Sequence, residues 1–324
     1  MSFNAGPVLL LGGTGKVARS IAALLAKSDI PTIQASRSGA TTEPDATHIS
    51  GVAFDWHDET TYAKALAAKP RAVFLVAPPI LDSFSPMSAF INIAQEKGVR
   101  RFVLLSSSAL EADEEGVAMG KVHAYLKALG DKGQVEWAAL RPTWFQGELW
   151  QRLHQFPLWQ AACGGRAGAD MLAENLVEHR AHVMSIWGEG KVYSATGEGR
   201  IPWVAVEDIA ASAFQLLTQE AAPNAEFLIL GPELLSYGDI AAIISDVLGR
   251  KVVHHQQTPR ERKDMFAMAG MPDGYADMMA ALDVQILHGS EERTNDVVLK
   301  LTGREPRKFR VMAEQRKEVW LSDA

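Results

Sequence analysis

The chain has 324 residues and a formal net charge of −7 at pH 7, and 47% of its residues are hydrophobic and 22% charged. This composition is typical of a globular enzyme, and the acidic balance argues against a nucleic-acid partner. A single cysteine, Cys163, excludes an intramolecular disulfide. No apolar run resembles a membrane span or a signal peptide, so we expect a cytoplasmic protein with no membrane partner.

The first part of the chain alternates short apolar runs with helical patterns. Apolar runs predict strands at 8–11, 32–36, 51–55, 72–77, 101–106 and 136–141, and helices are predicted between them at 17–27, 60–68, 86–97 and 120–129. Continuous apolar strands that alternate with helices are typical of a parallel sheet covered on both faces. We therefore predict an α/β fold with a Rossmann-like, doubly wound parallel sheet. Ligands bind such sheets at the carboxyl ends of the strands.

The pattern changes after the sixth predicted strand. Residues 146–190 are rich in Trp, His and Gly without strand periodicity, and residues 191–206 look extended. A helix is predicted at 207–219, a strand at 226–230, and then a helix that Ser236 opens and Gly249 ends. Beyond residue 258 we expect mostly helices. We predict that residues 1–145, completed by about 204–235, form the Rossmann core, and that 146–203 and 236–324 form a smaller, mostly helical lobe for the substrate.

A glycine-rich turn joins the first strand to the first helix, where residues 8–18 read VLLLGGTGKVA. Such a turn brings backbone N–H groups and a helix N-terminus close to a phosphate. A Walker loop is excluded, because Leu10 and Val17 replace its first glycine and its magnesium-binding Ser or Thr. An ordinary strand-to-helix turn is the alternative, but the position between a strand and a helix favours a dinucleotide. The candidate pyrophosphate-binding residues are Gly12, Gly13, Thr14, Gly15, Lys16 and Val17.

The end of the second predicted strand distinguishes NADP from NAD. An acidic residue about twenty positions past the glycine turn would bind the ribose 2′-hydroxyl of NAD. This chain instead has Ser36, Arg37 and Ser38 at that place. An arginine can bind a 2′-phosphate with two hydrogen bonds, and the serine hydroxyls can donate to it. We therefore predict NADPH/NADP as the cofactor, with a solvated loop arginine as the alternative.

Further candidates follow the ends of the other predicted strands. The remaining cofactor contacts predicted there, from the adenine to the nicotinamide end, are Asp55, Trp56, Ala77, Pro78, Pro79, Ser106 and Pro142. The candidate substrate contacts are Trp144, Phe145 and Ser108. Aromatic faces suit a flat ring system and stabilise a cation, whereas packing in the core and turn capping are the alternatives. We predict no metal site.

The acid that usually serves carbonyl reduction is missing. Nicotinamide reductases of this build often use Tyr-x-x-x-Lys, in which the lysine lowers the pKa of a tyrosine that protonates the alkoxide. None of the five tyrosines has a lysine four residues later. Either another group serves as the acid, the candidates being His123 (with Lys127 four residues on), Ser107 and Tyr125, or the substrate needs no acid. An iminium ion accepts hydride at carbon and becomes a neutral amine, so its site needs only orientation and electrostatic support.

Several segments together resemble the fungal ergot alkaloid reductases, namely residues 12–16, 54–56, 101–106, 140–145, 192–197 and 230–237. These reductases, festuclavine synthase and agroclavine dehydrogenase, are NmrA-like members of the short-chain dehydrogenase superfamily. The resemblance covers nearly the whole chain and implies an atypical Rossmann fold with NADPH as hydride donor. It also implies reduction of a cyclic iminium, formed when chanoclavine-I aldehyde or its reduced relative closes on its own amine.

Residues 146–173 are an insertion relative to this family's pattern, which passes almost directly from a segment like residues 144–145 to one like 174–176. The insertion is either a lid or pocket wall beside the nicotinamide, a surface insertion, or retained intron sequence. It leaves the exact substrate open.

Three functions follow from these patterns. We predict an NADPH-dependent reductase of a cyclic iminium in fungal ergot or indole-type alkaloid biosynthesis, with a small aromatic or alkaloid substrate, acting as a monomer or homodimer. One alternative is a carbonyl or enone reductase on another small secondary metabolite, with His123 or a serine as acid. The other is a non-catalytic NADP-sensing regulator of the NmrA type.

Overall fold

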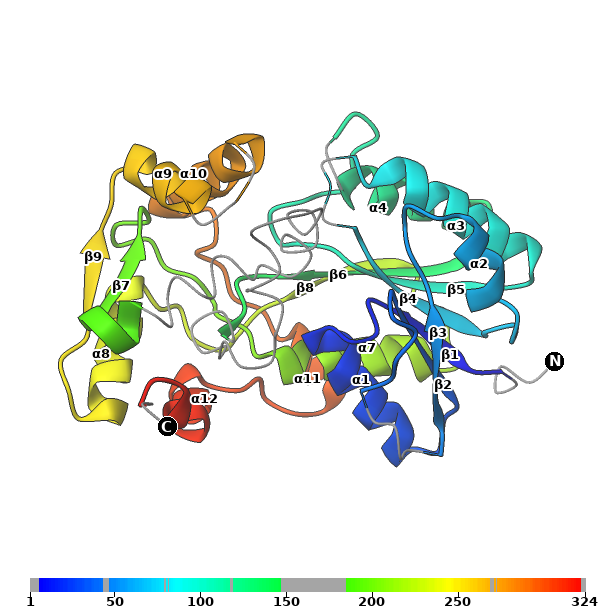
Figure 1. Cartoon of the computed structure of the whole chain (residues 1–324), viewed down its shortest axis with the longest axis horizontal. Helices are drawn as coiled ribbons and strands as arrows, with labels where there is room; N and C mark the ends of the chain where they lie inside the picture. The colour runs from blue at the N-terminus through cyan, green and yellow to red at the C-terminus, as the bar shows by residue number, and fades with distance from the viewer. Residues whose placement is uncertain are drawn as a thin grey trace. The chain divides into compact units, whose positions relative to one another are not determined.

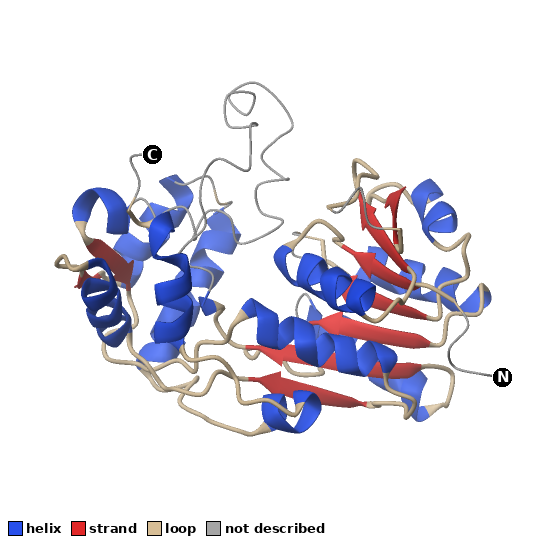
Figure 2. Ribbon diagram, turned by 90° about the horizontal axis from the view of Figure 1, so that it is seen from below, coloured by secondary structure: helices blue, strands red, loops and turns tan. Residues whose placement is uncertain are grey.

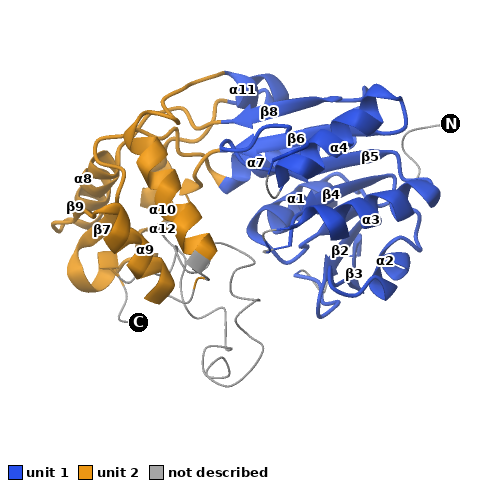
Figure 3. Cartoon of the chain, turned by 90° about the horizontal axis from the view of Figure 1, so that it is seen from above, with its two compact units in different colours: residues 1–142, 206–229, 296–304 blue, residues 143–205, 230–295, 305–324 orange. Residues whose placement is uncertain are grey.

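The computed structural model describes residues 6–42, 47–78, 80, 82–116, 119–146, 185–268, 271 and 273–321. The chain forms two compact units, which Figure 3 shows in different colours. Unit 1 comprises residues 1–142, 206–229 and 296–304, and unit 2 comprises residues 143–205, 230–295 and 305–324. The segment 296–304, predicted as part of the C-terminal lobe, belongs to unit 1, whereas residues 143–145, 204–205 and 230–235, predicted as part of the Rossmann core, belong to unit 2.

Unit 1 is built on a seven-stranded sheet with the order β3-β2-β1-β4-β5-β6-β8. All of its neighbouring strands are parallel, and the order reverses beside β1, which pairs with β2 on one side and β4 on the other. The strands are β1 (Val8–Leu11), β2 (Thr32–Ser36), β3 (Ile49–Ala53), β4 (Ala72–Val76), β5 (Arg101–Leu105), β6 (Glu136–Pro142) and β8 (Ala225–Ile229). This arrangement confirms the predicted Rossmann-like, doubly wound parallel sheet.

Helices cover both faces of this sheet, as Figures 1 and 2 show. One layer consists of α2 (Thr60–Ala65), α3 (Phe84–Glu96) and α4 (Met119–Asp131). The other consists of α1 (Lys16–Lys27), α7 (Val206–Thr218) and α11 (Val297–Thr302), where α7 packs against both α1 and α11. The buried residues of α1 are Val17, Ala18, Ile21, Ala22 and Leu25, whose helical spacing puts them on one face.

Most predicted bounds differ from the structure by no more than two residues, and in two elements a turn explains the difference. The predicted strand at 51–55 lies two residues earlier, because Asp55 enters a turn in which the Asp58 N–H donates to the Asp55 carbonyl at 3.1 Å. The predicted helix at 60–68 ends at Ala65, shortly before Lys69, which has a left-handed φ of 50°. Both differences arise where a turn competes with the regular element.

Unit 2 is mostly helical and contains a two-stranded parallel sheet of β7 (Lys191–Ser194) and β9 (Val253–Gln256). Among the described residues its helices include α8 (Tyr237–Leu248), α9 (Pro259–Met268), α10 (Asp273–Leu287), α12 (Phe309–Arg316) and the short 3₁₀ helix η5 (Lys317–Val319). The predicted start and end of α8 are confirmed: Ser236 and Asp239 form a capping box, and Gly249 has φ 64°. The sequence analysis missed β9, because its VHHQ sequence has no apolar pattern.

Large aromatic side chains form the core of unit 2. Trp203, Tyr237, Phe309 and Trp320 are buried in one cluster, and the Trp203 indole N–H donates to the Leu235 carbonyl at 3.1 Å. Trp203 is therefore a core residue with its one polar group satisfied. In the described part of both units, no helix is long and apolar enough to cross a membrane.

Candidate functional site

The glycine turn after β1 has a geometry that requires glycine. Gly12 has φ 61°, and the Gly15 N–H donates to the Gly12 carbonyl at 2.8 Å. The Gly13 N–H donates to the Ala35 carbonyl of β2 at 2.8 Å. A Cβ atom on Gly13 would lie only 2.8 Å from Gln34 Cα and from the Ala35 nitrogen. The turn therefore lies directly against β2, at the carboxyl ends of the strands.

The N-terminus of α1 is suited to an anion. Gly15 precedes the helix with ψ 162°, no side chain caps it, and the first turn holds no acidic residue. The backbone N–H groups of the first turn and the helix dipole both favour a negative charge there. Thr14 is exposed and Val17 is buried, and the six predicted residues follow one another through the turn and into the first turn of α1. This geometry fits a dinucleotide pyrophosphate.

The loop after β2 exposes the side chain of Arg37 to solvent. The Ser36 hydroxyl donates to the Ala40 carbonyl at 3.2 Å, and the Ala40 N–H donates to Ser38 Oγ at 3.2 Å. The Gly39 N–H closes the turn onto the Ser36 carbonyl at 3.0 Å. Arg37 and Ser38 are exposed at the tip. A guanidinium beside two serine hydroxyls has the donor set that a 2′-phosphate needs.

Asp55 and Trp56 follow β3. The Asp55 carboxylate accepts the His57 N–H at 2.9 Å, and the Trp56 ring packs edge-on against Phe54 with centroids 4.9 Å apart. The Tyr62 hydroxyl donates to the Trp56 carbonyl at 2.9 Å. Burial raises the pKa of Tyr62 to about 12, which keeps this hydroxyl protonated as a donor. The Trp56 ring is thus held in a defined orientation at the sheet edge.

Ser106 follows β5 beside the end of β4. Its backbone N–H donates to the Leu140 carbonyl at 2.7 Å, while its hydroxyl is buried and has no hydrogen-bond partner among the described residues. Buried hydroxyl groups normally have a hydrogen-bond partner, and the amide or ribose of a bound cofactor would provide one here. Ala77 and Pro78 follow the neighbouring strand β4, and Pro79 lies outside the described residues.

Arg141 near the end of β6 holds the loop that carries the other two serines. Its guanidinium donates to the carbonyls of Ser107 at 3.5 Å and Ser108 at 3.2 Å. It also forms an ion pair of 2.9 Å with Glu226 of β8, and the Ser108 N–H donates to the Pro142 carbonyl at 2.8 Å. The contact of Arg141 with this loop was not predicted, because the sequence of β6 does not show which loop its arginine reaches.

His123 on α4 is buried and does not offer a surface to a substrate. Its ring lies 5.4 Å from the Trp137 ring, and its Nε2 is 3.5 Å from Glu226 Oε2. Burial lowers the pKa of His123, against a smaller opposite effect of Glu226. Lys127, the expected partner, instead pairs with Asp131 at 2.8 Å. Proton donation to a substrate would require His123 to leave this packing.

Tyr125 also has a local partner. Its hydroxyl donates to Asn92 Oδ1 on α3 at 2.5 Å, and its ring packs against Phe84 at the start of α3. Tyr125 therefore joins α3 to α4. Ser107 is the third candidate acid, and its Oγ accepts the Ala109 N–H at 3.3 Å, which is a turn cap.

The residues after β6 belong to unit 2. Trp144 is buried in the core cluster of that unit with 9% exposure. Phe145 is half-buried and forms an isolated parallel β-bridge with Val204. The Thr143 hydroxyl donates to Glu291 Oε2 at 3.1 Å, and both side chains are buried. Glu291 also pairs with Arg293 at 3.3 Å. Glu291 was not among the predicted site residues. Residues 147–173 of the predicted insertion lie outside the described residues.

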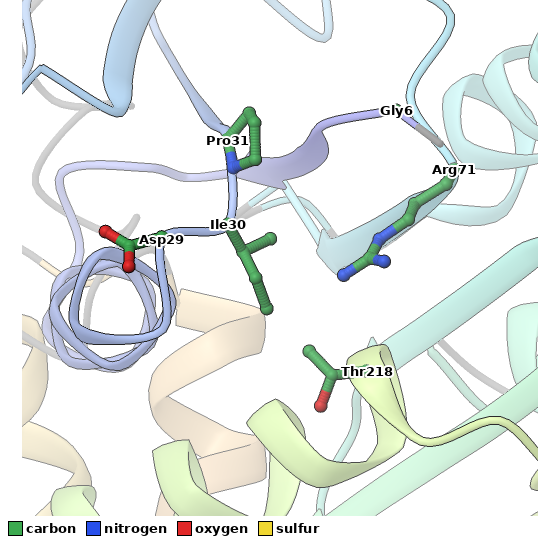
Figure 4. Close-up of a pocket in the computed structure, with 6 residues that line it drawn as sticks. All are labelled: Gly6, Asp29, Ile30, Pro31, Arg71 and Thr218. Carbon is green, nitrogen blue, oxygen red and sulfur yellow. The ribbon is translucent and has the colours of Figure 1, made fainter. Parts of the chain in front are cut away.

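A cavity of about 320 Å³ opens at the opposite, amino edge of the sheet of unit 1. Figure 4 shows the residues that line it: Gly6, Asp29, Ile30, Pro31, Arg71 and Thr218. Pro31 precedes β2 and Arg71 precedes β4. This cavity is therefore separate from the glycine turn, and none of the predicted site residues lines it.

Comparison with known proteins identifies the family. Residues 12–149 match a family model described as NAD(P)H-binding. Festuclavine synthase II of Penicillium roqueforti (strain FM164) is 36% identical over 97% of this chain and 99% of its own length. Agroclavine dehydrogenase of Claviceps fusiformis is 38% identical over 97% of this chain and 98% of its own length. The chain belongs to the festuclavine synthase and agroclavine dehydrogenase family. The predicted resemblance and the predicted NAD(P)H-binding core are thereby confirmed.

Solved structures support the same fold at low sequence identity. An NADPH-dependent quinone oxidoreductase of Escherichia coli, complexed with NADPH, is 19% identical with a TM-score of 0.73, covering 95% of this chain and 99% of that chain. A triphenylmethane reductase of Citrobacter sp., complexed with NADP(H), is 19% identical with a TM-score of 0.70 over 96% and 99% of the two chains. At this identity these structures establish the Rossmann-like fold alone.

Proposed function

We propose that this protein is an NADPH-dependent reductase that transfers hydride to the carbon of a cyclic iminium in ergot or indole-type alkaloid biosynthesis. The observation that supports this proposal is a match to this family in a chain without the Tyr-x-x-x-Lys acid of carbonyl reductases. Relatives named festuclavine synthase and agroclavine dehydrogenase are 35–38% identical over 97% of the chain. No tyrosine of the chain is followed four residues later by lysine.

The residues at the carboxyl ends of β1, β2 and β5 would hold NADPH, which supplies the hydride. The glycine turn and the first turn of α1 would bind the pyrophosphate. Arg37, with Ser36 and Ser38, would bind the 2′-phosphate and select NADPH over NADH. The buried Ser106 hydroxyl would bind the nicotinamide end. Arg141 would keep the Ser107–Ser108 loop in place while the substrate binds.

Hydride transfer to an iminium balances without a proton donor. A C–H bond forms at the iminium carbon, and the π electron pair of the C=N bond becomes the lone pair of a neutral amine. The chain has to orient the substrate and stabilise its positive charge until the hydride arrives. Phe145, which is half-buried, is proposed to contact the substrate, whereas Trp144 lies in the core of unit 2 and Ser108 is buried, so contact with either of them would require their packing to open. This chemistry agrees with the local partners of His123 and Tyr125.

The direct test is NADPH oxidation by the purified protein, followed by absorbance, with a clavine-type iminium beside a matched aldehyde that cannot cyclise. Consumption with the iminium alone would support acid-free hydride transfer. Consumption with the aldehyde alone would replace the proposal by a carbonyl reductase, with Ser107 as the first acid to test. Tight NADPH binding without turnover of either compound would reject the enzyme and favour the regulator.

A further inference from the structure

Gln34 is a polar residue in the middle of the buried strand β2, and it is 0% exposed. It pairs in register with Leu10 of β1, and its Nε2 donates to the Gly13 carbonyl at 3.0 Å. This side chain of β2 therefore reaches the glycine turn. The backbone of β2 also holds that turn, because the Gly13 N–H donates to the Ala35 carbonyl.

The other contacts of the Gln34 amide lie in the loop that follows the same strand. The Thr42 N–H donates to Gln34 Oε1 at 2.8 Å, and the Gln34 Nε2 donates to the Thr42 hydroxyl at 2.9 Å. The Thr42 hydroxyl also lies 3.2 Å from Oε1. Both ends of the amide are thus satisfied, as a buried polar side chain requires.

One buried amide therefore joins two loops that are far apart in sequence. One loop is the glycine turn, and the other is the described part of the loop after β2, which carries Arg37 and Ser38 and reaches Thr42. The tip of the second loop has its own hydrogen bonds, and Ser36 at its start is held to the neighbouring strand by the Phe54 N–H, which donates to the Ser36 carbonyl at 2.9 Å. None of these bonds sets the position of the loop against the glycine turn. The Gln34 amide fixes that position by donating to one loop and by both donating to and accepting from the other.

We propose that Gln34 is a positioning residue that sets the discrimination between 2′-phosphorylated and unphosphorylated adenine dinucleotides. It does so by holding the Ser36–Ser38 loop at a defined distance from the pyrophosphate turn, so that Arg37 meets the 2′-phosphate. The inference rests on the proposed use of NADPH and adds to it a residue that does not itself contact the cofactor. A buried network of this kind holds its geometry because every alternative leaves a polar group unpaired.

Two variants separate this role from a general loss of stability. Gln34→Leu keeps the size of the side chain and removes every hydrogen bond of the amide. Thr42→Val removes only the hydroxyl of a half-buried loop residue, and its backbone N–H still donates to Oε1. Thr32→Val is the matched control, because Thr32 is buried at the amino end of the same strand and donates its hydroxyl to the Ile30 carbonyl at 3.0 Å.

The readout is calorimetric binding of adenosine 2′,5′-bisphosphate and of adenosine 5′-monophosphate, which differ only in the 2′-phosphate and require no turnover. We expect the wild-type protein to prefer the bisphosphate. Gln34→Leu should reduce that preference about tenfold, the order of one lost hydrogen bond, and Thr42→Val about two- to threefold in the same direction. Binding of the monophosphate should change less than about twofold in both variants, and Thr32→Val should leave the preference unchanged.

Four results would overturn the inference. Equal weakening of both probes in Gln34→Leu, or an unchanged preference in a folded Gln34→Leu, would make Gln34 a purely structural residue. Should Gln34→Leu not fold, an unchanged preference in Thr42→Val would have the same meaning. A wild-type protein that binds both probes equally would instead reject the proposed NADPH selectivity, and the inference with it.

Discussion

Arg141 and Glu226 form an ion pair of 2.9 Å between the last two strands of the sheet, and the arginine is almost completely buried while the glutamate is half exposed. The same guanidinium donates to the carbonyls of Ser107 and Ser108. The pair therefore connects strand β8 to the loop after β5, where the substrate is proposed to bind. Removal of the Glu226 charge would leave the buried Arg141 charge without its partner, whereas removal of the Arg141 charge would leave a carboxylate that water can solvate. The two changes should therefore differ in their effect on stability.

We expect Glu226→Gln to lower the free energy of unfolding by about 1–2 kcal/mol, because the buried Arg141 loses its charged partner. The half exposure of Glu226 keeps the value at this low end. Urea unfolding measures the change. Asp131→Asn is the matched control, since it breaks an exposed ion pair with Lys127, and we expect less than about 0.5 kcal/mol there. Equal effects in the two variants would contradict the role assigned to Arg141.

Gly13→Ala should prevent cofactor binding or destabilise unit 1, because the new Cβ would meet the β2 backbone at 2.8 Å. Gly274→Ala is the control, because a methyl group added at this residue of α10 would have no neighbouring atom within 4 Å. The control should keep or raise stability by up to about 1 kcal/mol. NADPH binding by fluorescence and thermal unfolding check both variants. Normal NADPH affinity in Gly13→Ala would show that the turn does not contact the cofactor.

Arg37→Gln should raise the KM for NADPH by about ten- to a hundredfold and leave the KM for NADH unchanged, because charge-assisted hydrogen bonds to the 2′-phosphate are lost. Arg100→Gln removes the same charge at the amino edge of the sheet, where Arg100 donates to the Gln134 carbonyl at 2.9 Å. That control should leave both KM values unchanged. Steady-state kinetics with the two cofactors decide the matter, and parallel changes in both KM values would exclude a 2′-phosphate contact.

His123 should affect stability against pH rather than turnover. Burial lowers its pKa below the ordinary value of 6.5, so near pH 6.5 the unfolded chain binds a proton at this histidine and the folded chain does not. The free energy of unfolding therefore falls as the pH drops below about 6.5. The half-buried His254, whose pKa is also lowered by burial, adds a change of the same sign.

His123→Phe should make this loss of stability less steep and leave kcat within about twofold, because the side chain packs beside Trp137 and has no exposed surface. Urea unfolding at several pH values and NADPH oxidation measure the two quantities. Loss of turnover in a folded His123→Phe protein would restore His123 as the acid of a carbonyl reductase.

The sequence by itself determined the alternation of strands and helices and the glycine turn. The strands β1 and β2 are short and local, and each is preceded by proline and followed by Gly12 or Arg37, so their bounds agree with the structure to the residue. The capping box of Ser236 and Asp239 is equally local. The place of Arg37 directly after β2 is also local, because it follows from the order of the residues alone.

Only the tertiary structure decided the roles of Gln34, Arg141 and His123. The contacts of the first two are hydrogen bonds to loops that follow or precede other strands, and no periodicity in one segment specifies a partner in another. His123 has a favourable spacing to Lys127 on α4, yet packing against β6 and β8 buries it. Burial depends on what the rest of the chain places around a residue, and this is why sequence predicted the cofactor turn but not the network that supports it.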